Sequence, residues 1–276
     1  MIWLAAVALL CFAANSVLAR LALGGGHIDP ASFTAIRLAS GALVLGLLLR
    51  YRGGAGVASP GRFTGAALLF LYAAPFSFAY VSLPTGTGAL LLFGAVQLTM
   101  IGSGLVTGER PRPREWVGLV AALGGLVYLN LPGLGAPSLQ GALLMLLAGA
   151  AWGFYSLRGR GAGPPLARTA ESFLFAAPLG LALAAVGLPH AHVSAAGVWC
   201  AVASGAVASG GGYAVWYTVL PRLSATRAGT LQLAVPVIAA LAGTALLGET
   251  VSLRLTLSAL AILGGVGLAI SGRNRG

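Results

Sequence analysis

Long apolar stretches separated by short polar breaks run along the whole chain. A bilayer core of about 30 Å requires about 20 apolar residues in a helix, and breaks at arginines, Gly-Pro pairs and turn residues leave segments of this length. The ten spans that the pattern predicts are 2–22, 30–49, 62–82, 84–107, 116–131, 138–157, 168–187, 195–219, 224–247 and 253–271. Because the connections are short, we expect an all-α integral membrane protein with ten transmembrane helices.

The composition agrees with a membrane protein. Only 8% of the residues are charged and 58% are hydrophobic, whereas a soluble domain carries about 25% charged residues. The net charge of +11 comes entirely from arginine, because the chain has no lysine. The absence of lysine excludes a P-loop and a lysine imine with retinal or pyridoxal phosphate. The basic residues are spread between the apolar runs, so no nucleic-acid partner is expected.

The arginines gather on alternate connections, which predicts the orientation because basic loops remain cytoplasmic. One side carries 13 of the 16 arginines, and the opposite side carries only Arg20 and Arg254. The 13 are Arg50, Arg52, Arg62, Arg110, Arg112, Arg114, Arg158, Arg160, Arg168, Arg222, Arg227, Arg273 and Arg275. Both termini are therefore expected in the cytoplasm, which requires an even number of crossings.

The chain repeats itself at an offset of 140 residues. Gly108-Glu109 recurs as Gly248-Glu249, and Leu123-Gly124-Gly125 recurs as Leu263-Gly264-Gly265. Near the third and eighth spans the offset is 137. We expect two five-helix repeats, 1–134 and 135–276, and because five is odd the second enters the membrane from the opposite side. Inverted repeats of this kind are frequent in secondary transporters.

The chain resembles the drug/metabolite transporter superfamily in its EamA-type branch. The resemblance rests on the run ASFTAIRLASGA from Ala31 to Ala42, on Thr107-Gly108-Glu109-Arg110-Pro111, and on the echo Leu246-Leu247-Gly248-Glu249-Thr250. It covers essentially the whole chain. It implies a ten-helix exporter of small metabolites, amino acids among them, that uses no ATP, and it extends to the YddG-like amino-acid exporters.

Helix breaks at corresponding positions of the two halves predict the transport site. Pro75 in the third span corresponds to Gly212, which ends the run Gly210, Gly211 and Gly212, and these residues are predicted hinges. Aromatic side chains follow both breaks and are predicted to line a central cavity: Phe76, Tyr80, Tyr213, Trp216 and Tyr217. For Tyr80 and Tyr217, which lie near helix ends, an interfacial aromatic belt is the alternative.

Polar and aromatic residues at helical spacing add further candidates. Phe12 and Asn15 form an i, i+3 pair in the first span, and Trp152 and Tyr155 form the equivalent pair in the sixth. The amides of Gln97 and Gln232 both donate and accept hydrogen bonds, which suits a zwitterionic solute. These polar side chains also suit hydrogen bonds between helices, and this alternative remains open.

Arg37 is the one arginine that lies well inside a predicted span. A charge at that depth indicates function, and its anion is expected to be a substrate carboxylate or a helix C-terminus. The alternative is a structural pair or a side chain that snorkels to the interface, because the second span is not one of the two interrupted helices.

We therefore expect a secondary transporter in the bacterial inner membrane that exports small metabolites, most readily amino acids and among these aromatic ones, by alternating access. Its expected partners are a small-molecule substrate and the lipid bilayer, with no obligatory protein partner, no cofactor and no metal. Export of other metabolites or drugs by proton antiport is the alternative. A membrane-embedded enzyme or a receptor-like bundle fits less well, because the three histidines and five acids do not converge on one catalytic group.

Overall fold

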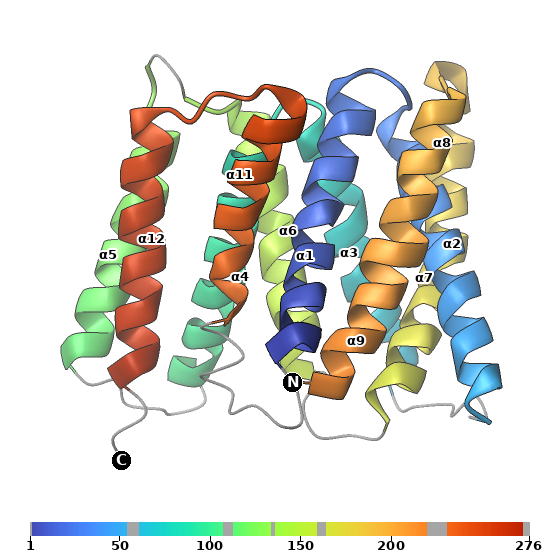
Figure 1. The fold of residues 1–276 in the computed structure, drawn as a ribbon, viewed down its shortest axis with the longest axis horizontal. Helices are drawn as coiled ribbons and strands as arrows, with labels where there is room; N and C mark the ends of the chain where they lie inside the picture. The colour runs from blue at the N-terminus through green and yellow to red at the C-terminus, as the bar shows by residue number, and fades with distance from the viewer. Residues whose placement is uncertain are drawn as a thin grey trace.

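The computed structural model describes residues 2–53, 61–106, 113–133, 136–158, 164–219 and 231–272, and within them the chain is helical (Figure 1). The first half contains α1 (Ile2–Ala19), η1 (Arg20–Gly24), α2 (Pro30–Tyr51), α3 (Arg62–Tyr80), α4 (Thr85–Val106) and α5 (Pro113–Asn130). The second half contains α6 (Leu139–Arg158), α7 (Pro165–Gly187), η2 (Leu188–His190), α8 (Ala195–Val202), η3 (Ala203–Gly211), α9 (Gly212–Val219), α11 (Ala234–Leu247) and α12 (Leu253–Gly272).

Seven helices of the described chain are long and apolar enough to cross a membrane, and two shorter apolar helices lie at 234–247 and 253–268. Large apolar side chains face outward, for example Trp199 with 72% of its surface exposed and Val120 with 65%. Such a surface suits lipid rather than water. The first residue of α1 and the last turn of α12 lie at the same end of the bundle (Figure 1).

Polar residues at the connections set the helix ends. The carboxylate of Asp29 accepts a hydrogen bond from the Ser32 amide at 2.8 Å and so caps α2, whose first residue is Pro30. Ser194 caps α8 in the same way through the Gly197 amide. Gly248 ends α11 with a positive φ of 66°, a conformation that glycine adopts without a steric penalty.

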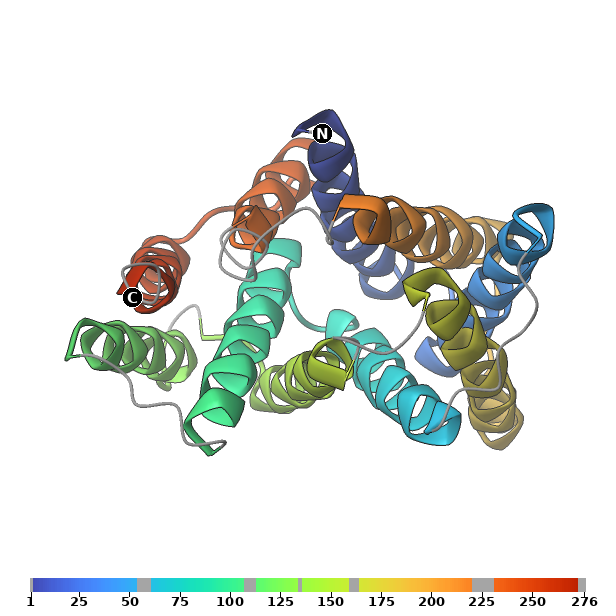
Figure 2. The same cartoon turned by 90° about the horizontal axis from the view of Figure 1, so that it is seen from below.

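Helices related by the 140-residue offset pack against each other: α2 contacts α7, α4 contacts α11 and α5 contacts α12. Figure 2 shows α5 and α12 side by side at one edge of the bundle. The α5–α12 contact is reciprocal. A Cβ atom added to Gly125 would lie 2.9 Å from Ala261 Cβ, and one added to Gly265 would lie 3.1 Å from Ala121 Cβ. Gly125 and Gly265 correspond at the 140-residue offset, and so do Ala121 and Ala261, so the two contacts are counterparts of each other.

Candidate functional site

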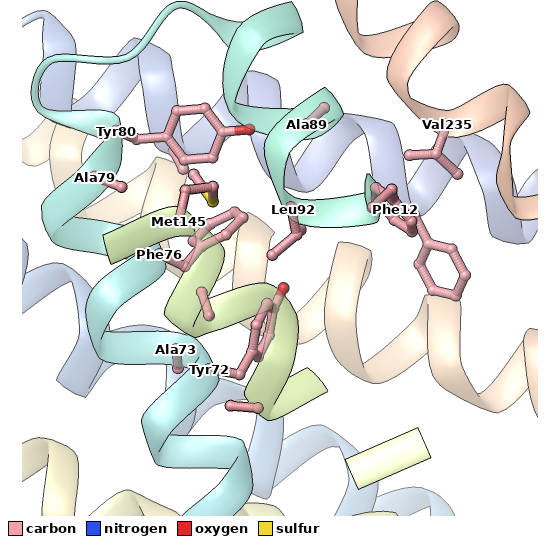
Figure 3. Close-up of a cluster of buried hydrophobic side chains, with 14 of the residues drawn as sticks. Phe12, Tyr72, Ala73, Phe76, Ala79, Tyr80, Ala89, Leu92, Met145 and Val235 are labelled. Carbon is pink, nitrogen blue, oxygen red and sulfur yellow. The ribbon is translucent and has the colours of Figure 1, made fainter. Parts of the chain in front are cut away.

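A central pocket with a volume of about 20 Å³ lies where helices of the two halves meet. From the first half, α1 contributes Phe12, Asn15 and Ser16, α3 contributes Tyr72 and Phe76, and α4 contributes Leu92 and Phe93. From the second half, α6 contributes Trp152 and α9 contributes Tyr213. Figure 3 shows Tyr72, Phe76 and Tyr80 projecting from α3 in the same direction, toward α4 and Leu92.

Trp152 occupies the middle of an aromatic network. Its ring centroid lies 4.9 Å from that of Tyr72 and 5.1 Å from that of Tyr213, and it stacks on Tyr155 at 5.4 Å. Aromatic pairs at these separations contribute about 0.5–1.5 kcal/mol beyond their buried area. The network therefore joins α3, α6 and α9 around the pocket.

The predicted pair Phe12 and Asn15 faces the same pocket from α1. The Phe12 ring lies 5.9 Å from Tyr213 and 5.7 Å from Trp216. Phe12 and Trp152, which correspond in the two halves, thus both contact Tyr213. Trp216 is buried behind Phe12 and is not itself a wall of the pocket.

The side chain of Asn15 is engaged by two serines of η3. Its Nδ2 donates to Ser209 Oγ at 3.3 Å, and its Oδ1 accepts a hydrogen bond from Ser204 Oγ. Both the amide nitrogen and the amide oxygen of Asn15 therefore join α1 to η3, as expected of hydrogen bonds between helices.

The predicted hinges lie at irregular points in two helices. Pro75 is inside α3, and Gly210 and Gly211 are the last two residues of the π-helix η3. Gly212 begins α9, where an added Cβ would lie 2.7 Å from Cys11 Cβ, so the glycine lets α9 approach α1 closely. π-Helical segments occur frequently at functional sites. The glycine run was predicted only to loosen the helix, and the structure has a nine-residue π-helix there.

Tyr80 is completely buried at the end of α3, with 0% of its surface exposed. Its ring lies 4.8 Å from Phe76, and its hydroxyl donates to the Thr85 carbonyl at 3.4 Å. A residue of an interfacial belt would be in contact with the membrane surface. The belt therefore does not describe Tyr80, which contacts the pocket through Phe76.

Beyond Tyr80, an ion pair joins the two halves. Arg20 Nε lies 3.2 Å from Glu249 Oε1, and Arg20 Nη1 donates to the Val81 carbonyl at 3.1 Å. The second carboxylate oxygen of Glu249 accepts from the Thr85 amide at 2.8 Å. These residues lie at the end of the bundle that is away from the two termini.

Arg37 is buried, with 1% of its surface exposed. Its Nη2 donates to Tyr72 Oη at 2.8 Å, and its guanidinium carbon lies 4.6 Å from the Phe76 ring centroid and 5.0 Å from that of Tyr72. The side chain therefore does not snorkel. It packs on α3 next to Pro75, although the second span was expected to lie apart from the interrupted helices.

Three further predicted residues, Gln97, Gln232 and Tyr155, are not among the described residues that line the pocket. Gln97 is buried on α4, and its Nε2 has no hydrogen-bond partner in the described part of the chain. Gln232 is half-buried just before α11. Tyr155 contacts the pocket through Trp152. Tyr217 lies on α9, but its side chain is outside the described residues.

Four residues of the pocket wall were not predicted from the sequence: Ser16, Tyr72, Leu92 and Phe93. A signal for Tyr72 was present, because 72, 76 and 80 are spaced by four residues and share one helix face. No comparable signal marks Leu92 or Phe93 in a helix that is apolar all round. Among the described residues, no group of three histidine, cysteine, aspartate or glutamate side chains is placed to hold a metal ion.

Comparison with known proteins identifies relatives over the whole chain. The model of the EamA-like transporter family matches residues 1–131 and again 139–271. Uncharacterized protein PA1977 of Pseudomonas aeruginosa is 53% identical over 274 residues, which cover 98% of this chain and 94% of that protein.

Two further similarities are more distant. The threonine/homoserine exporter RhtA of Salmonella typhimurium is 35% identical over 149 residues, which are 51% of this chain and 49% of RhtA. One crystal structure of a protein shares the fold with a TM-score of 0.68 at 23% identity, over 96% of this chain and 97% of the other.

Proposed function

Because this chain belongs to the EamA-like transporter family, we propose that it exports small metabolites, with amino acids as the leading class, across the bacterial inner membrane by alternating access. The family consists of transporters rather than enzymes, and the helical, lipid-facing surface makes the chain a multi-pass membrane protein. We further propose that the chain belongs to the YddG-like branch of amino-acid exporters.

The observation that carries the proposal is a pocket with walls from both halves of the chain. Trp152 and Tyr213 of the second half close against Phe12, Tyr72 and Phe76 of the first. A site between two repeats is exposed to one side or the other when the repeats change their relative tilt. A pocket inside a single repeat would not be switched in this way.

We also propose that residues 1–134 and 135–276 form two inverted repeats. The family model matches each half separately. The reciprocal contacts of Gly125 and Gly265 support a two-fold relation between α5 and α12. In these contacts residues further along α5 meet residues earlier in α12, so the two helices are antiparallel, as an inverted repeat requires.

The ion pair of Arg20 and Glu249 supports a gate. We assign the end that carries the termini to the cytoplasm, because Arg50, Arg62, Arg158 and Arg168 are at that end. The opposite end is then periplasmic. There the Arg20–Glu249 ion pair and the hydrogen bond from Arg20 to the Tyr80 carbonyl join the first span, α3 and the loop after α11, and we propose that this contact closes the site toward the periplasm.

The relative RhtA, a threonine/homoserine exporter, supports amino acids as the substrate class. The pocket volume of about 20 Å³ leaves room for about one water molecule, so the proposal requires the two halves to move apart before a solute enters. Several aromatic walls favour a solute with an apolar or aromatic side chain.

Counterflow in liposomes tests the proposal. Purified protein preloaded with an unlabelled amino acid is expected to accumulate the labelled form, and a panel of amino acids ranks the substrates. Repeating the assay with and without an imposed pH gradient tests proton antiport. No counterflow with any amino acid or other small metabolite would contradict export.

A further inference from the structure

The guanidinium of Arg37 has the surroundings of an anion site without an acid. In the described part of the chain no carboxylate lies within ion-pair distance of it, and Nη1 has no hydrogen-bond partner. Two acids of the chain are engaged elsewhere, since Asp29 caps α2 and Glu249 binds Arg20. A buried charge is costly unless an anion and hydrogen bonds compensate it.

Arg37 has no arginine counterpart in the second half of the chain. Position 37 corresponds to 177 at the 140-residue offset, and 177 is an alanine that is buried on α7. The same position of the fold is therefore filled in the other half by a methyl group. The charge at position 37 is therefore a feature of the first half alone.

Arg37 reaches the pocket through its contacts. Tyr72 and Phe76, the rings that flank the guanidinium, are both pocket walls. Tyr72 Oη accepts the hydrogen bond from Arg37 Nη2, so its own hydrogen is free to be donated to a bound solute. Donation from arginine polarises the phenol and strengthens that second hydrogen bond.

We propose that Arg37 and Tyr72 recognise a carboxylate of the transported solute, so that the substrate class is small metabolites with a free carboxylate next to an apolar part. The inference rests on the proposed function and deepens it. The carboxylate binds the Tyr72 hydroxyl and the unused Nη1 of Arg37, while the apolar part stacks on Trp152 and Phe76. A charge-assisted hydrogen bond corresponds to about 10-fold to 100-fold in affinity.

Binding to matched pairs of solutes tests the carboxylate. The purified protein is titrated with phenylalanine and with phenylalaninamide, and binding is followed by thermal stabilisation. Wild type is expected to bind the acid at least about 10-fold more tightly than the amide. In Arg37→Gln this preference is expected to disappear, and in Arg37→Lys to survive in part.

Two further variants separate recognition from folding. Tyr72→Phe keeps the ring and removes only the hydroxyl, so it is expected to lower the preference without unfolding the protein. Phe154→Ala, on the exposed face of α6, should keep the full preference. Equal binding of acid and amide by wild type, or an unchanged preference in both Arg37→Gln and Tyr72→Phe, would overturn the proposal. Because binding is measured separately from counterflow, acid-selective binding without transport would count against export alone.

Discussion

Arg20 and Glu249 are 229 residues apart in the sequence and form an ion pair of 3.2 Å. Glu249 also accepts a hydrogen bond from the Thr85 amide, and Arg20 donates to the Tyr80 and Val81 carbonyls. Four segments therefore meet at two side chains: the end of the first span, the α3–α4 connection, the start of α4 and the loop after α11.

Breaking this ion pair is expected to expose the pocket to the periplasm. Glu249→Gln removes the charge, and an ion pair of this exposure contributes about 0.5–1 kcal/mol, which is about 2-fold to 5-fold in the open population. The measurement is the labelling rate of Ser16→Cys by a membrane-impermeant thiol reagent, in a background where Cys11 and Cys200 are replaced by alanine.

The control for this prediction is Arg254→Ala. Arg254 lies at the same end of the bundle but donates to the Leu131 carbonyl, so its loss should leave the labelling rate unchanged. The exchanged pair Arg20→Glu with Glu249→Arg should recover part of the wild-type protection. Equal labelling in wild type and Glu249→Gln would mean that the ion pair does not control access.

The aromatic network is expected to determine substrate affinity. Trp152→Ala removes ring contacts to Tyr72, Tyr155 and Tyr213 and should lower kcat/KM about 10-fold or more. Trp216 supports Phe12 from behind, and Gln97 carries an amide nitrogen without a partner in the described chain, so Trp216→Ala and Gln97→Ala are expected to lower uptake without unfolding the protein. The matched control is Phe154→Ala, on the same helix but with 51% of its surface exposed. Wild-type rates in a variant would remove that residue from the site.

Asn15 is expected to act mainly on stability. Asn15→Ala breaks the hydrogen bonds to Ser204 and Ser209, and interhelical hydrogen bonds contribute about 0.6–2 kcal/mol in membrane proteins. The free energy of unfolding of Asn15→Ala, Ser204→Ala and the double variant gives the coupling. Losses that simply add would show that the two side chains do not stabilise one another.

Asp29 is expected to make stability depend on acid pH. Burial raises the pKa of its carboxyl, but the hydrogen bonds from Ser32 and His192 outweigh burial and hold the pKa below its usual value. A lowered pKa stabilises the fold above the unfolded pKa of about 3.9, and this contribution is lost as the pH falls through the folded pKa.

The stability difference between wild type and Asp29→Asn should therefore be present at neutral pH and shrink below pH ~4. Melting temperatures across this range measure it. Ser194→Ala removes a cap that does not titrate, so its effect should not vary with pH. A constant difference for Asp29→Asn would contradict the role of the carboxylate.

The orientation of the repeats predicts opposite exposure for two equivalent acids. Cysteines that replace Glu109 and Glu249 should be labelled from the cytoplasm and from the periplasm, respectively. Glu109 lies outside the described residues, whereas Glu249 follows the end of α11. Labelling of both cysteines from one side would exclude an inverted repeat.

The helix positions followed from the sequence because charge and backbone breaks are local. The span predicted at 30–49 is α2 from Pro30 to Tyr51, and the span predicted at 62–82 is α3 from Arg62 to Tyr80. In both cases an arginine or a proline sets the boundary. For the predicted span 224–247, the described helix begins at Ala234, and residues 220–230 lie outside the described part.

The contacts between helices could not be predicted from local pattern. The serines that bind Asn15 are 189 and 194 residues away, and nothing near Asn15 indicates them. The π-helix has the same apolar composition as an α-helix, so hydrophobic periodicity does not distinguish them. Arg37 was visible as a buried charge, but its position against Tyr72 depends on how α2 and α3 pack.

Gly205 of η3 lies directly against the backbone carbonyl of Arg37, and a side chain at position 205 would collide with that carbonyl and with Ser40 Oγ. The π-helix therefore contacts the same turn of α2 from which the guanidinium projects. Any rewinding of 203–211 must shift that turn. If Arg37 binds the substrate as proposed, we expect loading of the pocket and movement of η3 to be coupled directly, because the two groups are in contact.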